Sequence, residues 1–188
     1  MEEVLLASAS TRRASMLAER GYAVIQRPLT AAERPHRHGI SIGEQVEYIL
    51  SGKVEAARRE LEHPCIIVAD TLVEDPDDHC RPLGQPESPA EALSMLLRLQ
   101  SRNHRVWTGC ALLLDGEEHR WVSSATVSIG DLSDDVIEAL ILTGSWRGKA
   151  GGYDLAGPMA AHAELADGAA ETVLGLAPEL FKALLRSG

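Results

Sequence analysis

The sequence lacks any hydrophobic run long enough to cross a membrane, because no stretch approaches the roughly 18 consecutive apolar residues that a spanning helix requires. We also expect no secretory signal, since Met1–Glu3 is acidic where a signal needs basic residues and the apolar run Val4–Ala7 is too short. Cys65, Cys80 and Cys110 are too few and too scattered for a disulfide framework. We therefore expect a cytoplasmic protein of a reducing compartment, with no membrane partner.

Basic residues are also scarce. The 18 Lys and Arg against 28 Asp and Glu give a formal net charge of −10, which repels the phosphate backbone of nucleic acid. A nucleic-acid polymer is thus excluded as a partner, whereas a small anion in a local basic pocket is not. With 45% hydrophobic and 24% charged residues, the 188-residue chain has the composition of a globular protein. One domain over residues 1–188 is expected, and a bilobed form with a central cleft fits the same length.

Short apolar or alternating runs predict the strands. Cys65–Ala69 has the pattern of a buried strand that ends abruptly at Asp70–Thr71. Asp115–Gly116, between two alternating runs, predicts a hairpin. A short strand is also expected within the glycine-rich segment 144–157. The other predicted strands are Val4–Ala7, Tyr22–Gln26, Val106–Leu114 and Arg120–Ile129.

Capping residues predict the helices. S-x-x-E boxes at Ser41–Glu44 and Ser88–Glu91 open helices that run toward Leu61 and Leu99. Polar loops are expected at residues 27–39 and 75–86. The mixture of hairpin and crossover connections predicts an α/β fold, with a mixed sheet flanked by helices. The other predicted helices are Thr11–Arg20, Asp134–Leu142 and Pro178–Arg186.

The segment Ser8–Arg13 places two hydroxyls and two guanidiniums where a predicted strand ends and a helix begins. Helix N-termini attract anions, whereas Arg12 and Arg13 oppose the helix macrodipole at that position. A bound phosphate would remove this conflict. The alternative is a serine cap followed by solvated arginines, and the residues alone do not decide between the two.

Two carboxylates add to this pattern. Asp70 lies at the predicted end of a strand, where α/β enzymes display catalytic groups, and Glu33 lies in a proline-flanked loop. Two carboxylates near a phosphate site suit a divalent cation such as Mg²⁺. Taken singly, each is more often a turn or surface residue. Gly144–Lys149 is one residue short of a Walker phosphate loop, so that motif is excluded.

Seven motifs follow one another along the chain: S-x-S-x-R-R from Ser8, Glu33, Lys53, A-D-T from Ala69, L-G-x-P from Leu83, H-x-V-x-T-G from His104 and G-K-A-G-G-Y from Gly148. In this order and spacing they resemble the Maf family over nearly the whole chain. The resemblance implies an elongated, twisted mixed sheet like that of inosine triphosphatases, and a homodimer is expected because the family is often dimeric. It also implies a nucleoside triphosphate pyrophosphatase that needs a divalent metal cation, Mg²⁺ or Mn²⁺.

The resemblance also implies roles for individual residues. Asp70, Glu33 and Lys53 would be catalytic, with Glu33 and Asp70 holding the metal. Arg12 and Thr71 resemble the branch of the family that acts on dTTP and UTP. We expect Arg12, Arg13, Lys53 and Lys149 to line one cleft as a local positive region. The substrate-binding residues would be Ser8, Ser10, Arg12, Arg13, Thr71, Gln85 and Lys149.

Several positions depart from the family pattern, among them Gln85 and Ala156. Gln85 stands where a lysine is usual, so one phosphate-facing cation is lost, and Ala156 stands where the pyrimidine branch has a glutamine. Weaker or altered binding of the triphosphate is expected from these changes. A nucleotide sensor or cell-division regulator that binds without turnover is therefore the alternative function, and a scaffold without any ligand ranks third.

Overall fold

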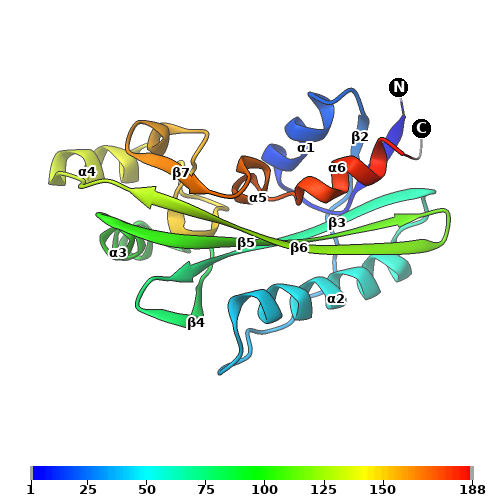
Figure 1. Cartoon of the computed structure of the whole chain (residues 1–188), viewed down its shortest axis with the longest axis horizontal. Coiled ribbons are helices and arrows are strands. Elements are labelled where there is room, and N and C mark those ends of the chain that lie inside the picture. Colours follow the sequence, from blue (N-terminus) through cyan, green and yellow to red (C-terminus); the bar gives the residue numbers. More distant parts are fainter. Residues whose placement is uncertain (1, 187–188) are drawn as a thin grey trace.

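The computed structural model describes residues 2–186, so Met1, Ser187 and Gly188 of the predicted domain lie outside the described residues. Within them, the chain forms a seven-stranded mixed sheet flanked by helices, which confirms the predicted α/β fold (Figure 1). The strands are β1 (Glu3–Leu6), β2 (Ala23–Gln26), β3 (Cys65–Asp75), β4 (Asp78–Leu83), β5 (Arg102–Leu114), β6 (Glu117–Ile129) and β7 (Ala163–Asp167). The helices are α1 (Thr11–Ala18), α2 (Ile42–Glu60), α3 (Pro89–Leu99), α4 (Asp134–Leu142), α5 (Ala170–Leu174) and α6 (Pro178–Leu184).

The sheet has a parallel part and an antiparallel part. β1 pairs in parallel with β2 and with β3, and these connections contain α1 and α2, as parallel crossovers require. The antiparallel part runs from β3 through β5 and β6 to β7, and β4 pairs with β3. The β5–β6 hairpin turns at Asp115 and Gly116, both in the left-handed region, as the sequence predicts.

Helices cover both faces of the sheet, with α2 on one face and α1, α5 and α6 on the other (Figure 1). The capping box of α2 is confirmed, because Ser41 Oγ accepts from the Glu44 N–H at 3.4 Å and Glu44 Oε2 accepts from the Ser41 N–H at 2.9 Å. Leu50 of α2 packs in a buried cluster with Val68 of β3, and Leu180 of α6 packs on the opposite face. Burial on both faces explains the continuous apolar run that opens β3.

The prediction that this strand ends at Asp70–Thr71 is wrong, because β3 continues to Asp75. Glu74 and Asp75 are buried. Each carboxylate accepts a hydrogen bond from the protein, Glu74 from Trp107 and Asp75 from Arg98, and these bonds replace the lost water. The loop predicted at residues 75–86 contains β4, which pairs with β3 and is mostly exposed. An edge strand of this kind carries no apolar alternation, so the sequence pattern does not reveal it.

The glycine-rich segment 144–157 contains no strand among its described residues. It has a 3₁₀ turn at Ala150–Gly152 instead, because Gly151 and Gly152 have φ values of 73° and 72° that a strand does not allow. The predicted second capping box is only half formed, since Glu91 Oε2 accepts from the Glu87 N–H at 2.8 Å and not from that of Ser88. Strand β7 and helix α5 were not predicted.

One edge of β3 is covered by strands only near its two ends. β1 pairs there with Ile66 and Ile67, and β4 pairs from Val73 onward. Between these pairings, residues 68–72 have no strand beside them on this edge in the described part of the chain. Asp70 and Thr71 therefore lie at a gap between the end of β1 and the end of β4. No helix within residues 2–186 combines the length and apolar character needed to span a membrane.

Candidate active site

A cavity of about 340 Å³ opens at this gap in the edge of β3. One wall is the turn that follows β1, and another is the face of α2 around Lys53. The loop before α2 contributes a partly apolar wall, while Gln85 and Gly148 reach the cavity from the far side of the gap. The predicted site residues that line it are Ser8, Ser10, Glu33, Lys53 and Gln85.

Lys53 joins the two predicted catalytic carboxylates. Its Nζ lies 2.6 Å from Asp70 Oδ1 and 2.5 Å from Glu33 Oε1. The side chains of Lys53 and Asp70 are 17% and 10% exposed, whereas that of Glu33 is 65% exposed. The three groups carry a net formal charge of −1. Lys53 contacts Asp70 from α2, and Glu33 reaches Lys53 from the loop before α2, which has no regular structure.

Asp70 Oδ2 is buried and has no hydrogen-bond partner among the described residues. Buried carboxylate oxygens are almost always paired, because losing water without gaining a donor costs free energy. An oxygen in this state beside a cavity is suited to a water molecule, a proton or a cation. The extended backbone of β3 fixes its position, since β5 pairs with β3 from Cys65 to Val73.

The turn after β1 places hydroxyls at the cavity. Ser8 Oγ accepts from the Ser10 N–H at 3.2 Å, and Ser10 Oγ caps α1 by accepting from the Arg13 N–H at 3.4 Å. Gln26 Nε2 donates to the carbonyls of Ser8 and Ser10 at 3.1 and 3.2 Å, so β2 holds the turn in place. The turn thus presents small polar groups at a helix N-terminus, the arrangement that favours an anion.

Arg13 is directed into the protein. Its guanidinium donates to Ser8 Oγ and the Ala69 carbonyl, each at 3.1 Å, and to Thr71 Oγ1 at 2.9 Å. Burial lowers the pKa of this guanidinium, and the nearby Asp70 carboxylate opposes that effect. Arg13 therefore ties the turn to β3 across the gap, and its guanidinium has protein acceptors within the described residues.

Glycine is required where the chain passes Arg13. Gly175 ends α5 with φ at 106°, and a Cβ there would lie 2.8 Å from Arg13 Nε and 3.2 Å from Thr71 Oγ1. Its carbonyl accepts from Arg13 Nε at 2.8 Å. Thr71 Oγ1 also bonds Thr108 Oγ1 at 2.8 Å, so Thr71 forms part of a buried network behind the cavity.

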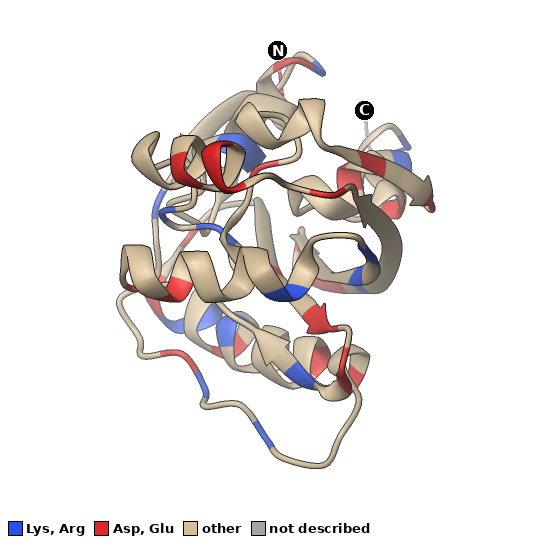
Figure 2. Cartoon of the chain, turned by 90° about the vertical axis from the view of Figure 1, so that its left-hand side faces the viewer, with Lys and Arg blue, Asp and Glu red and all other residues tan. Residues whose placement is uncertain are grey.

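Arg12 and Lys149 meet on a third residue that the sequence analysis did not single out. Asp154 Oδ1 lies 3.3 Å from Arg12 NH1, and its Oδ2 lies 3.3 Å from Lys149 Nζ. Of the four cations expected to line one cleft, only Lys53 lines the cavity, and the other three bind protein groups around it. Figure 2, viewed from the end of the molecule with α3 and α4, shows basic and acidic residues interspersed along the elements.

Asp154 directly follows the G-K-A-G-G-Y motif, and this position was the one sequence feature that could have identified it as a site residue. It was not singled out because acidic residues in loops are usually solvated. His104 was also missed as a supporting residue. Its Nε2 lies 2.8 Å from the Tyr153 hydroxyl, and burial lowers the pKa of His104 to about 4 and raises that of Tyr153. This neutral pair anchors the residue next to Asp154.

The donor set fits a divalent cation of the magnesium type. Glu33 lines the cavity with the serine hydroxyls, and Asp70, which has the unpartnered oxygen, lies behind it against Lys53. Mg²⁺ commonly takes one or two protein carboxylates and completes its shell with water and phosphate oxygens. The described residues contain no cluster of three or more His, Cys, Asp or Glu that could hold a metal alone, so the ligand would have to supply the remaining oxygens.

Comparison with known proteins places the chain in a family. The Maf family, described as Maf-like protein, matches residues 3–188. A dTTP/UTP pyrophosphatase of Granulibacter bethesdensis is 35% identical over 92% of this chain and 87% of its own, and one of Moorella thermoacetica is 36% identical over 84% and 80%. A solved structure of the Staphylococcus aureus Ham1 protein aligns with a TM-score of 0.44 and 18% identity, over 69% of this chain and 73% of its own. The match over residues 3–188 confirms the resemblance seen in the motifs, and the chain belongs to the Maf family.

Proposed function

We propose that this chain is a nucleoside triphosphate pyrophosphatase, which hydrolyses its substrate to a nucleoside monophosphate and pyrophosphate. The observation that carries the proposal is the Glu33–Lys53–Asp70 chain at one cavity with the Ser8–Ser10 turn. The relatives named dTTP/UTP pyrophosphatases, at 35% and 36% identity, support the reaction class. Cleavage of a phosphoric anhydride needs a positioned water and neutralisation of phosphate charge, and the cavity offers groups for both.

In the proposed reaction, the oxygen of a water attacks the α-phosphorus of the triphosphate. The bond from the α-phosphorus to the bridging oxygen breaks, and the pyrophosphate leaves with that electron pair. Asp70 accepts the proton of the water on Oδ2, the oxygen without a protein partner. Lys53, which donates to Oδ1 at 2.6 Å, fixes the carboxylate and leaves Oδ2 to accept the proton.

A divalent cation, Mg²⁺ or Mn²⁺, would be held by Glu33 and Asp70 together with phosphate oxygens. When bound, it supplies charge neutralisation on the phosphates and polarises the phosphorus for attack. Lys53 Nζ now lies between the same two carboxylates and compensates their charge. The hydroxyls and N–H groups of the Ser8–Ser10 turn would receive the phosphate tail.

Pyrimidine nucleoside triphosphates, dTTP and UTP, are the proposed substrates. Arg12 and Thr71 match the pyrimidine branch of the family, and the two relatives carry that activity in their names. Ala156 removes an amide that the branch uses, so selectivity against other bases is expected to be lower than in a chain with glutamine there.

The test is a panel of canonical and modified nucleoside triphosphates with Mg²⁺ or Mn²⁺, assayed separately for pyrophosphate and orthophosphate. The proposal expects pyrophosphate from at least one pyrimidine nucleotide, and no turnover when a chelator removes the metal. Orthophosphate as the sole product would contradict the reaction class.

A nucleotide sensor is the second candidate, favoured by Gln85, which lines the cavity without a charge. A sensor binds nucleotide tightly and produces no pyrophosphate with any metal. A scaffold without a ligand would show no rise in melting temperature with nucleotide, because only binding to the native state stabilises it.

A further inference from the structure

Asp154 lies between Arg12 and Lys149, two of the cations that the family resemblance assigns to substrate binding. Its two oxygens face Arg12 NH1 and Lys149 Nζ, each at 3.3 Å, and its side chain is only 17% exposed. A carboxylate shared between two cations is the arrangement that a phosphate oxygen pair would adopt there. We propose that Asp154 is an internal counter-anion of the substrate site, which competes with the polyphosphate for Arg12 and Lys149 and so sets its affinity.

The backbone around Asp154 holds this carboxylate in place. The Ala156 N–H donates to Asp154 Oδ1 at 3.1 Å, and the Gly157 N–H donates to the Asp154 carbonyl at 3.0 Å. The preceding Tyr153 is buried and bonded to His104. Asp154 is therefore a fixed part of the site and not a solvated loop acid.

The two cations do not depend on Asp154 for their position. Arg12 Nε donates to the Leu174 carbonyl at 3.0 Å, and Lys149 Nζ donates to the Ser145 carbonyl at 2.9 Å. Both contacts are shorter than the 3.3 Å to Asp154, which exceeds the usual length of a charge-assisted hydrogen bond, roughly 2.7–2.9 Å. The contact to Asp154 is thus the one that an incoming anion can exchange without unseating either cation.

This inference rests on the proposed function, because it takes the ligand to be a polyphosphate. A bound polyphosphate would bring its negative charge next to Asp154, and two anions at a partly buried site repel each other. Removing the charge of Asp154 should strengthen binding, whereas a residue that merely organises the loop would weaken it when changed.

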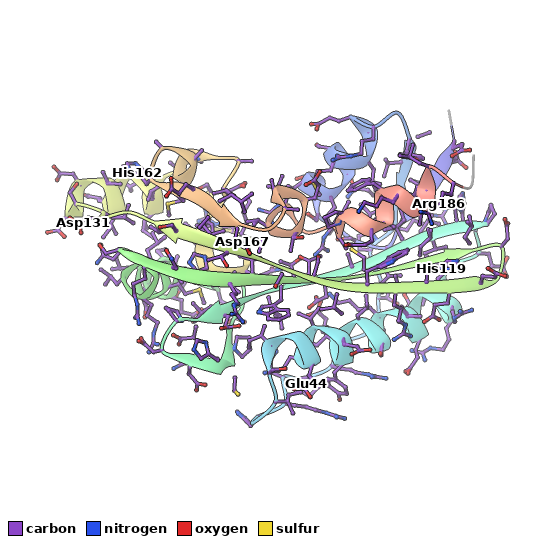
Figure 3. The ribbon with its side chains drawn as sticks, viewed as in Figure 1. Glu44, His119, Asp131, His162, Asp167 and Arg186 are labelled. Carbon is purple, nitrogen blue, oxygen red and sulfur yellow. The ribbon has the colours of Figure 1, made fainter. Side chains whose placement is uncertain are left out.

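The experiment measures binding of inorganic tripolyphosphate by calorimetry without added divalent cation. Asp154→Asn keeps the shape and the acceptor for the Ala156 N–H while it removes the charge. We expect its affinity to rise about tenfold over the unchanged chain, the gain that relief of one close like-charge contact gives. Asp167→Asn is the matched control, because it removes one charge from an exposed residue of β7 for which no ion pair is found in residues 2–186 (Figure 3).

Combination with Arg12→Met should abolish most of the gain, because the freed cation is then missing. Equal or weaker binding by Asp154→Asn, the same gain in Asp167→Asn, or no tripolyphosphate binding in any variant would each overturn the inference. Pyrophosphate release from dTTP and UTP with Mg²⁺ is measured on the same samples. Turnover without a gain in Asp154→Asn refutes the inference alone, whereas a gain without any turnover refutes the proposed function alone.

Discussion

Two buried carboxylates on the same strand, Asp70 and Asp75, have opposite surroundings. Asp75 has both oxygens occupied, since Oδ1 accepts from the Asp77 N–H at 3.0 Å and Oδ2 accepts from Arg98 NH1 at 2.6 Å. Asp70 has Lys53 on Oδ1 and no partner on Oδ2 among the described residues. Burial alone therefore does not identify a functional acid, and the difference lies in whether the folded chain uses every oxygen.

The unpartnered oxygen is informative only with its surroundings. His104 Nδ1 is also buried without a partner in the described chain, yet its ring faces a tyrosine hydroxyl and is kept neutral by burial. Asp70 instead lies beside a cavity with a cation and a second carboxylate. We therefore expect changes at Asp70 to reduce turnover, and changes at Asp75 and His104 to alter the stability of the fold.

The largest effect is expected from Asp70→Asn. The variant keeps the shape but removes the proton acceptor and the negative charge, so turnover should fall about a hundredfold or more, as for loss of a general base. The melting temperature should stay near that of the unchanged chain. Steady-state pyrophosphate release and thermal unfolding of one preparation check both, and a folded variant with near-normal turnover would make Asp70 a turn residue only.

Asp75→Asn should do the reverse. It leaves Arg98, 35% exposed, with only the longer contact to Asp77 at 3.6 Å, so we expect a loss of about 2 kcal/mol in unfolding free energy, below the value for a fully buried pair. For a chain of this length, that corresponds to a fall in melting temperature of roughly 4–8 °C. Turnover measured well below the transition should be unchanged, and a selective loss of activity would break the contrast with Asp70.

His104 predicts a pH dependence of stability. Its pKa is lowered from 6.5 to about 4, so the unfolded chain binds the proton first as the pH falls. The stability from the neutral ring is complete above pH 6.5 and is lost as the pH falls toward 4, which amounts to about 2 kcal/mol by pH 5. Denaturant titrations over this range should show the slope, and His104→Gln should flatten it relative to His119→Gln, a change at an exposed histidine.

The smallest effect is expected from Gln85→Lys. A lysine would add a cation to the cavity lining, so the KM for the triphosphate should fall about threefold with little change in kcat. The gain should shrink as salt is raised, because the added charge is partly exposed. Gln85→Met is the control of similar size without charge. An unchanged KM in Gln85→Lys would show that position 85 does not face the phosphates.

Local sequence signals predict much of the fold. Ser41 caps α2, and Asp115–Gly116 turns the hairpin, because both effects act within a few residues. β4 and β7 escaped prediction because they are mostly exposed, so no apolar period marks them. The continuation of β3 was missed because an aspartate such as Asp75 is typical of a loop. Its place in a buried strand depends on the ion pair with Arg98, which the sequence does not show.

The candidate site shows the same limit. The Ser8–Ser10 turn and Asp70 follow from motifs, and the structure brings them to one region with Glu33 and Lys53. The inward direction of Arg13 depends on carbonyls of Ala69 and Gly175, distant in sequence. The sharing of Asp154 by two cations likewise requires the fold, since Arg12 lies 142 residues away along the chain.

The central claim is that the Asp70 cavity directs water to the α-phosphorus of a nucleoside triphosphate. Hydrolysis of dTTP or UTP in isotopically labelled water, with the products analysed by mass spectrometry, tests this claim most directly. The account predicts one labelled oxygen in the nucleoside monophosphate, unlabelled pyrophosphate, and neither product above background with Asp70→Asn. Label in the pyrophosphate, or labelled orthophosphate as the product, would contradict it.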